Sequence, residues 1–342
     1  MINLVSFTLI FFLFYFCINK LNYFSKFLVD KDYKKIQSFH NKPVINVGGL
    51  LIILSLFFYG LLIDDSILNL KFLIAIGILN FLIGIFDDLK LIVNPLIRFF
   101  LLVACNLALI IYYDFSIKSF GVFFLDSLNQ IIFFKYLLVL LAIFFIINGS
   151  NLVDGFNGLL GIHSIIILLI LSFTLSESSY ELIHVKNYLY VLITATACFL
   201  ILNFPKAKIF LGDGGAYFLG SQISCISIII YNTSDFLSPF FISIILSNLF
   251  FEIFFSVFRK LYEKKNPFLP DGFHMHMIVY RHIKKKINLS NPATSICLNL
   301  IYIILILPSL FYYDKNFYCM IHFLIMIIVY MTFYFYLRNK KI

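Results

Sequence analysis

Long apolar runs separated by short polar stretches dominate this chain of 342 residues. An apolar run of roughly 20 residues can span a bilayer as a helix. Eleven segments fit this pattern, with approximate boundaries at 2–19, 45–63, 69–86, 95–113, 131–148, 158–176, 187–204, 215–231, 236–258, 293–312 and 317–337. Eleven such helices leave no room for a separate soluble domain. The pattern therefore predicts an all-α, polytopic transmembrane bundle that forms a single domain over residues 1–342.

Composition and charge agree with this class and indicate an orientation. The chain is 62% hydrophobic and 13% charged, whereas soluble domains carry about 25% charged residues. If the N-terminus lies outside, 21 of the 26 Lys and Arg residues fall on the inner side, as the positive-inside rule requires. The predicted topology is N-terminus outside and C-terminus cytoplasmic, with inner loops at 20–44, 87–94, 149–157, 205–214 and 259–292.

The net charge of +9 follows from this topology and from attraction to anionic membrane lipids. Nucleic-acid binding is therefore not expected. The first segment has no basic n-region and no small-residue cleavage site, so it is predicted to be a retained span and not a signal peptide.

Acidic residues gather at the predicted inner ends of the spans. Asp87 and Asp88 follow one apolar run, while Asp154 and Asp213 lie beside two others. Acids are expensive near lipid, so such a cluster indicates a functional site. Two carboxylates at a helix C-terminus repel each other and oppose the macrodipole. A metal or substrate proton would offset this cost, and pairing with Lys90 is the structural alternative.

Two glycine-rich motifs indicate metal and phosphate chemistry. Asn151, Asp154 and Asn157 recur every three residues, so a helical or turn-like segment presents them on one side. Their oxygens suit Mg²⁺, which usually keeps waters and substrate phosphates in its shell. Gly212-Asp213-Gly214-Gly215 opens a span, where unpaired N–H groups predict an anion site. Simple capping by Asp213 is the alternative.

The last inner loop carries Asp271, His274, His276 and Arg281 between basic clusters. Histidine and arginine suit charge-assisted contacts to a diphosphate, whereas no cysteine or third close ligand supports zinc. A polybasic loop lying on lipid headgroups is the alternative. Glu252, inside the ninth predicted span, either holds the bundle together through a polar partner or lines the active cavity.

In order and spacing these motifs resemble the polyprenyl-phosphate N-acetylhexosamine-1-phosphate transferases. That family includes phospho-N-acetylmuramoyl-pentapeptide transferase and the undecaprenyl-phosphate GlcNAc-1-phosphate transferases. The matching residues are Asp87-Asp88, Asn151 to Gly158, Gly212 to Gly215, Asp271 with His274-Met275-His276, and His40-Asn41-Lys42-Pro43 followed by Gly48-Gly49. Where the family usually has Pro and Arg, this chain has Ile45 and Asn46. Met277 replaces a final His, and Asn157 replaces an Asp that many members carry. These departures favour the branch that starts surface glycans.

The resemblance implies an enzyme of the bacterial inner membrane that moves a sugar 1-phosphate from a UDP-N-acetylhexosamine to undecaprenyl phosphate and releases UMP. The implied Mg²⁺ ligands are Asn151 and Asp213. The implied catalytic residues are Asp87 as base or acceptor-orienting group, Asp88 assisting it, and Asp154 organising metal or nucleotide. The implied substrate-binding residues are Lys42 for phosphate, Asn157 for uracil, and His274, His276 and Arg281 for the diphosphate.

Several alternatives remain open from the sequence. The donor could be the muramoyl-pentapeptide nucleotide of peptidoglycan synthesis, and transfer could proceed in one step or through a covalent aspartyl intermediate. A homodimer is compatible with the sequence. A transporter of lipid-linked sugars is the competing class, although transporter sites lie near the bilayer midplane and these acids lie at one interface.

Overall fold

The structure is a computed structural model that describes residues 4–20, 28–30, 43–60, 68–91, 94–175, 180–267, 269 and 271–340. Within these residues, eight helices are long and apolar enough to cross a membrane. They are α4 (Leu68–Asp88), α5 (Pro95–Tyr112), α7 (Ile132–Val153), α9 (Tyr180–Asn203), α10 (Gly212–Thr233), α11 (Pro239–Tyr262), α13 (Ser290–Ile306) with its 3-10 extension η1 (Leu307–Phe311), and α14 (Asn316–Asn339).

Three shorter apolar helices complete the bundle, namely α1 (Leu4–Lys20), α3 (Gly48–Gly60) and α8 (Leu159–Thr174). Two further short helices are α6 (Phe123–Asn129) and α12 (Met275–Lys284). Each apolar helix overlaps one of the predicted segments, which confirms the polytopic all-α class. The count of eleven crossings and the N-out orientation stay predictions.

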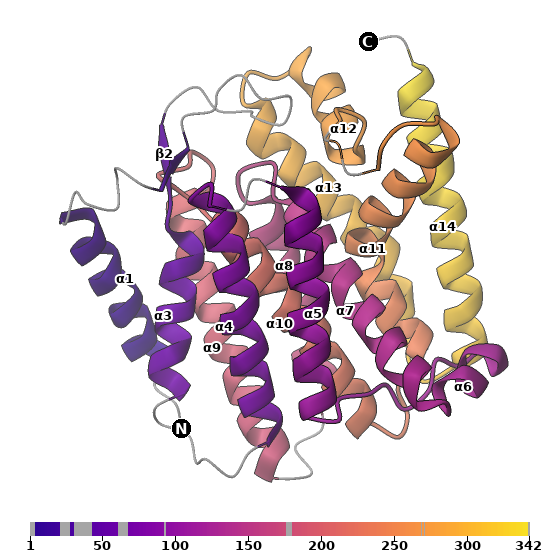
Figure 1. Cartoon of the computed structure of the whole chain (residues 1–342). Helices are drawn as coiled ribbons and strands as arrows, with labels where there is room; N and C mark the ends of the chain where they lie inside the picture. Colours follow the sequence, from indigo (N-terminus) through magenta and orange to yellow (C-terminus); the bar gives the residue numbers. More distant parts are fainter. Residues whose placement is uncertain are drawn as a thin grey trace.

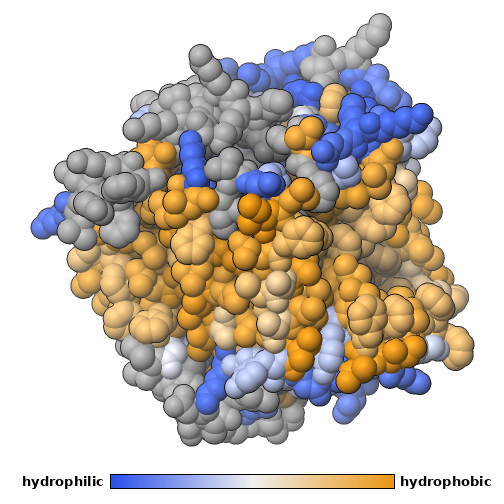
Figure 2. Space-filling view, viewed as in Figure 1, coloured by the Kyte–Doolittle hydropathy of each residue, from blue (hydrophilic) through white to orange (hydrophobic). Residues whose placement is uncertain are grey.

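The helices lie side by side, and α1 begins at the end of the bundle opposite to the one where α14 ends (Figure 1). An apolar belt surrounds the middle of the visible face, with hydrophilic residues above and below it (Figure 2). Large apolar side chains such as Phe100, Phe173 and Phe311 are exposed on this bundle. A surface of this kind in a soluble monomer would be an association site, whereas lipid chains solvate it in a bilayer.

Helix α10 occupies the centre of the bundle, in contact with α3, α4, α7 and α8. It is rich in small and polar residues, yet Gly214 to Tyr231 are all buried. Gln222 donates to the carbonyl of Leu73 at 3.0 Å and accepts from the Tyr188 hydroxyl at 2.7 Å. These bonds satisfy both the donor and the acceptor of the Gln222 amide, which would be costly to bury without hydrogen bonds. The axis of the bundle is thus a fixed scaffold for the first turn of α10.

A small sheet ties together two of the predicted inner loops, 20–44 and 205–214. Strands β1 (Val29–Asp30) and β2 (Val44–Asn46) are antiparallel, and β2 pairs in parallel with β3 (Ile209–Phe210). Strands of two or three residues are too short for a periodic signal, which is why the pattern does not predict them. The register places Asn46 opposite Phe210 and therefore next to the start of α10.

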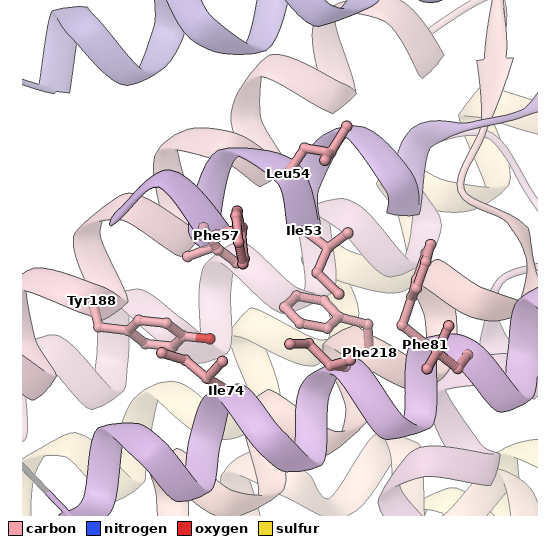
Figure 3. A pocket seen from close by; sticks show the side chains of 10 residues that line it. Ile53, Leu54, Phe57, Ile74, Phe81, Tyr188 and Phe218 are labelled. Atoms are coloured by element: carbon pink, nitrogen blue, oxygen red, sulfur yellow. The ribbon is translucent and has the colours of Figure 1, made fainter. Parts of the chain in front are cut away.

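An apolar cavity of about 220 Å³ lies between α3, α4, α9 and α10 (Figure 3). Its lining includes Ile53, Phe57, Ile74, Phe81 and Phe218. Tyr188 also lines it, but its hydroxyl is already bonded to Gln222. The cavity offers no acid, base or phosphate ligand, so the chemistry of this protein lies elsewhere.

Candidate active site

The end of α4 and the start of α10 meet through a carboxylate. The side chain of Asp88 accepts hydrogen bonds from the backbone N–H groups of Asp213 at 3.1 Å and Gly214 at 3.2 Å. Asn46 of β2 donates its side-chain amide to the same carboxylate at 3.1 Å. A negative group is favoured at a helix N-terminus. Asp88 therefore fills the anion position predicted at the start of α10.

Two glycines make this contact sterically feasible. A Cβ on Gly84 would lie 2.5 Å from the Cα of Gly214, so α4 and α10 touch backbone to backbone. Gly212 has a φ of +78°, and a Cβ there would lie 2.7 Å from a carboxylate oxygen of Asp88. Left-handed backbone of this kind favours glycine. The glycines of the second motif thus hold the two acidic helix ends together.

Asp87, Asp213 and Asn151 form the adjoining part of the site. The Asn151 amide, from the last turn of α7, donates to Asp213 at 2.7 Å. The carboxyl groups of Asp87 and Asp213 are hydrogen-bonding neighbours. Arg98, in the first turn of α5, donates to Asp87 and forms an ion pair with it. Residues separated by more than a hundred positions therefore converge at the ends of four helices.

Asp154 caps the C-terminus of α7 beside this group. Burial and, to a smaller extent, the negative charge of Asp88 together raise the pKa of Asp154 to about 7. Negative charge is in excess here, because four neighbouring carboxyl groups face the single guanidinium of Arg98 among the contacts described above. The site would gain from a bound cation.

The donor set fits Mg²⁺. Asn151 uses its amide nitrogen for Asp213, which leaves its oxygen for a ligand, and the nearby carboxylates supply further hard oxygens. No three His, Cys, Asp or Glu side chains of the described residues already form a closed metal site. Mg²⁺ needs no such cage, because it is usually bound by one or two carboxylates together with waters and substrate phosphates.

Asn157 has a different environment. Its backbone N–H donates to the Asn291 side chain at 2.8 Å, and its side-chain amide donates to the carbonyl of Pro205 at 2.9 Å. The next N–H, of Gly158, donates to Asn203 at 2.6 Å. These bonds fasten the loop after α7 to the start of α13, to the end of α9 and to Pro205 in the loop that follows α9. Contact of Asn157 with uracil stays a prediction.

The histidine motif lies against the same loop. His274 and His276 are buried, and the ring centroid of Phe156 is 5.7 Å from that of His276. Both histidines face Glu252 of α11, with nitrogen–oxygen distances of 3.5 and 3.7 Å. Of the two alternatives for Glu252, the structure thus provides the polar partner.

Arg281 is engaged within its own loop. Its guanidinium donates to the carbonyls of Gly272 and Met277 and lies 5.4 Å from the ring centre of Phe273. Its predicted contact with a diphosphate stays a prediction. The predicted residue Lys42, together with His40 and Asn41, lies outside the described residues.

Comparisons with known proteins agree with this arrangement. Residues 70–231, which include all four aspartates and Asn151, match the family described as Glycosyl transferase family 4. An undecaprenyl-phosphate alpha-N-acetylglucosaminyl 1-phosphate transferase of Thermotoga maritima is 30% identical over 255 residues, covering 72% of this chain and 71% of that protein. The chain belongs to glycosyl transferase family 4.

Other relatives in this family carry different names. A phospho-N-acetylmuramoyl-pentapeptide-transferase of Dictyoglomus thermophilum is also 30% identical, over 67% of this chain and 72% of that protein. The undecaprenyl-phosphate alpha-N-acetylglucosaminyl 1-phosphate transferase of Escherichia coli K12 is 26% identical over 74% of this chain and 69% of that protein. The predicted family is confirmed, and with it an enzyme class instead of a transporter. The relatives do not decide the donor.

Three residues of the site were not assigned to it from the sequence. Arg98 is one of the 21 predicted inner Lys and Arg residues. An arginine one turn into an apolar helix is a signal of a functional site that could have identified it. Asn46 was noted as a departure from the family pattern, and the structure shows that it binds Asp88. Glu252 gave the clearest signal, a deep acid, but its histidine partners come from a separate loop.

Proposed function

We propose that this protein transfers an N-acetylhexosamine 1-phosphate from a UDP-sugar to undecaprenyl phosphate at the cytoplasmic face of the bacterial inner membrane, releasing UMP. The product would start a cell-surface glycan of the O-antigen, capsule or teichoic-acid type. The observation that carries the proposal is the convergence of Asp87, Asp88, Asn151 and Asp213 at one polar end of an apolar bundle. A soluble nucleotide and a lipid phosphate can both reach such a place.

The reaction needs little covalent chemistry from the protein. A phosphate oxygen of the lipid attacks the sugar-linked phosphorus of the donor, a new P–O bond forms, and the P–O bond to UMP breaks. Positioning and charge neutralisation dominate such transfers. Arg98 fixes the carboxylate of Asp87, which we assign to orienting the acceptor. Asp88 fixes the start of α10 and therefore the backbone of Asp213.

Asp213 and Asn151 would hold Mg²⁺, which when bound neutralises charge on the donor diphosphate. Asp154, with a pKa of about 7, can take up or release a proton near neutral pH. We assign it to the nucleotide end of the site, together with Asn157. His276 would hold the diphosphate from the opposite loop, with His274 beside it.

The experiment is transfer of radiolabelled sugar phosphate from UDP-GlcNAc to undecaprenyl phosphate by purified protein. Asp213→Asn and Asp87→Asn should each abolish labelled lipid, and EDTA should do so reversibly, with recovery on adding Mg²⁺. Asp114→Asn is the matched control, because this acid pairs with Lys135 away from the site. Full turnover by either site variant would refute its assignment, and activity in EDTA would remove the metal.

The second candidate donor is the muramoyl-pentapeptide nucleotide, because the Dictyoglomus relative is as similar as the Thermotoga one. Both nucleotides should be offered in parallel to the same preparation. We expect UDP-GlcNAc to be used, since Asn157 and Met277 depart from the pattern of the family. Exclusive use of the pentapeptide donor would contradict this choice.

A further inference from the structure

Glu252 is a buried acid of α11 that faces two imidazoles at once. One carboxylate oxygen lies 3.5 Å from Nδ1 of His274, and the other lies 3.7 Å from Nδ1 of His276. The rings are stacked, with centroids 5.6 Å apart and planes 9° from parallel. Side-chain exposure is 4% for Glu252, 2% for His274 and 1% for His276. One carboxylate thus meets a parallel pair of histidines in a dry environment.

The two histidines differ at their second nitrogen. Nε2 of His274 lies 3.6 Å from Asp271, whose carboxylate accepts a 2.7 Å hydrogen bond from Arg259. His274 therefore lies between two carboxylates and is tied to the end of α11. The ordinary effect of burial would raise the pKa of Asp271, but the hydrogen bond and charge of Arg259 lower it below its usual value.

Both ring nitrogens of His276 are buried without a hydrogen-bond partner among the described residues; Nδ1 faces Glu252 at 3.7 Å, whereas no ion-pair contact is found for Nε2 there. Nε2 faces the loop after α7, since a Cβ on Gly155 would lie only 3.4 Å from it. A buried polar nitrogen left unpaired is destabilising, so each such group calls for an explanation. A phosphate oxygen bound at the Asn151–Gly158 motif would be such a partner.

We propose that Glu252 is a positioning residue that holds the two imidazoles, so that Nε2 of His276 is presented to a phosphate oxygen of the donor at the Asn151–Gly158 motif. His274 anchors the pair to Asp271 and does not contact the donor. The inference rests on the proposed function for the identity of the ligand. The partner of one imidazole nitrogen fixes the tautomer and the orientation of the ring, and therefore whether the other nitrogen donates or accepts a hydrogen bond. Glu252 on α11 would act on the donor in this way, through His276.

Kinetics test the proposal through non-additivity. Glu252→Gln should raise the KM for UDP-GlcNAc by roughly ten- to hundredfold, the value of a hydrogen bond to a charged group. The KM for undecaprenyl phosphate and the thermal midpoint should stay near wild type. His276→Gln should raise the same KM by a similar factor. The double variant Glu252→Gln/His276→Gln should raise it no further than the more impaired of the two single variants does. Ser256→Ala, a buried polar change one turn along α11, is the control.

Fully additive losses, or wild-type kinetics for Glu252→Gln, overturn the inference. Histidine ¹⁵N NMR of the detergent-solubilised protein gives a readout that needs no substrate, with signals assigned from His274→Gln and His276→Gln. Glu252→Gln should move these two signals and leave His163 and His322 in place. If wild type forms no labelled lipid, the proposed function fails while the spectra still decide the positioning. If the spectra do not respond, the positioning fails on its own.

Discussion

Arg98 offers the most informative single perturbation of the site. Its guanidinium is paired with Asp87, which adjoins both Asp88 and Asp213. Replacement by methionine keeps a long apolar stem and removes the charge. Three neighbouring carboxylates would then repel one another without a protein cation, and Asp87 would lose the bond that orients it.

The magnitude follows from the exposure of the pair. A hydrogen bond to a charged group contributes about 1.5–3 kcal/mol. Side-chain exposure of 29% for Arg98 and 18% for Asp87 lets water screen part of this, so the lower half of that range applies. Because about 1.4 kcal/mol is tenfold in rate, we expect Arg98→Met to lower kcat by roughly ten- to fortyfold.

The assay is steady-state transfer of labelled sugar phosphate with saturating Mg²⁺. Arg98→Lys should keep most of the activity, since it retains a cation at the same place. Lys135→Met is the matched control, because it breaks an ion pair with Asp114 that plays no part in the site. An unchanged kcat for Arg98→Met, or equal losses for the methionine and lysine variants, would refute the reasoning.

Three further predictions concern stability. Because the pKa of Asp154 is raised in the folded protein, ionisation of this group opposes folding as pH rises from about 4 towards 7 and above. In EDTA, Asp154→Asn should therefore raise the thermal midpoint at pH 8 and leave it unchanged near pH 4. The lowered pKa of Asp271 means that its contribution is present above its ordinary value of 3.8 and is lost as pH falls through the lower folded value. Thermal scans of Asp271→Asn against wild type should thus differ at pH 7 and converge at low pH. Gly84→Ala should destabilise the protein by about 1–3 kcal/mol through overpacking, because the new Cβ would lie 2.5 Å from the Gly214 backbone. Gly60→Ala is the control, since a Cβ there meets only a side-chain end at 3.2 Å. Equal denaturation midpoints for the two alanine variants would contradict this prediction.

The helices were predictable because lipid restricts the choice of structure. A chain in hydrocarbon must satisfy every backbone N–H and C=O internally, so apolar runs of sufficient length become helices. The acids at the ends of α4, α7 and α10 were predictable for a related reason: charge is excluded from the belt and gathers at its edge. Their gathering at one end then follows from the alternation of helix direction.

The partners of these acids were not predictable, because they depend on tertiary distances. Sequence spacing offered Lys90 as an alternative partner of the Asp87-Asp88 pair and gave no sign of a pairing with Arg98 of the next helix, which the structure shows for Asp87. The same holds for Asn46, which reaches Asp88 only because β2 pairs with β3. Glu252 and its histidines are separated by a loop whose path has no periodic signal.

The position of Asp88 limits which groups can bind the donor diphosphate. Because this carboxylate already uses the N–H groups of Asp213 and Gly214, these two N–H groups are not free for the donor diphosphate. Attraction for that anion would then come in part from other groups, among them a cation held by Asp213 and Asn151 and the buried Nε2 of His276. The donor would then bridge the aspartate cluster and the histidine loop, so neither half alone would suffice for binding. In this proposal Asp88 fixes the geometry of Asp213, and Glu252 fixes that of His276.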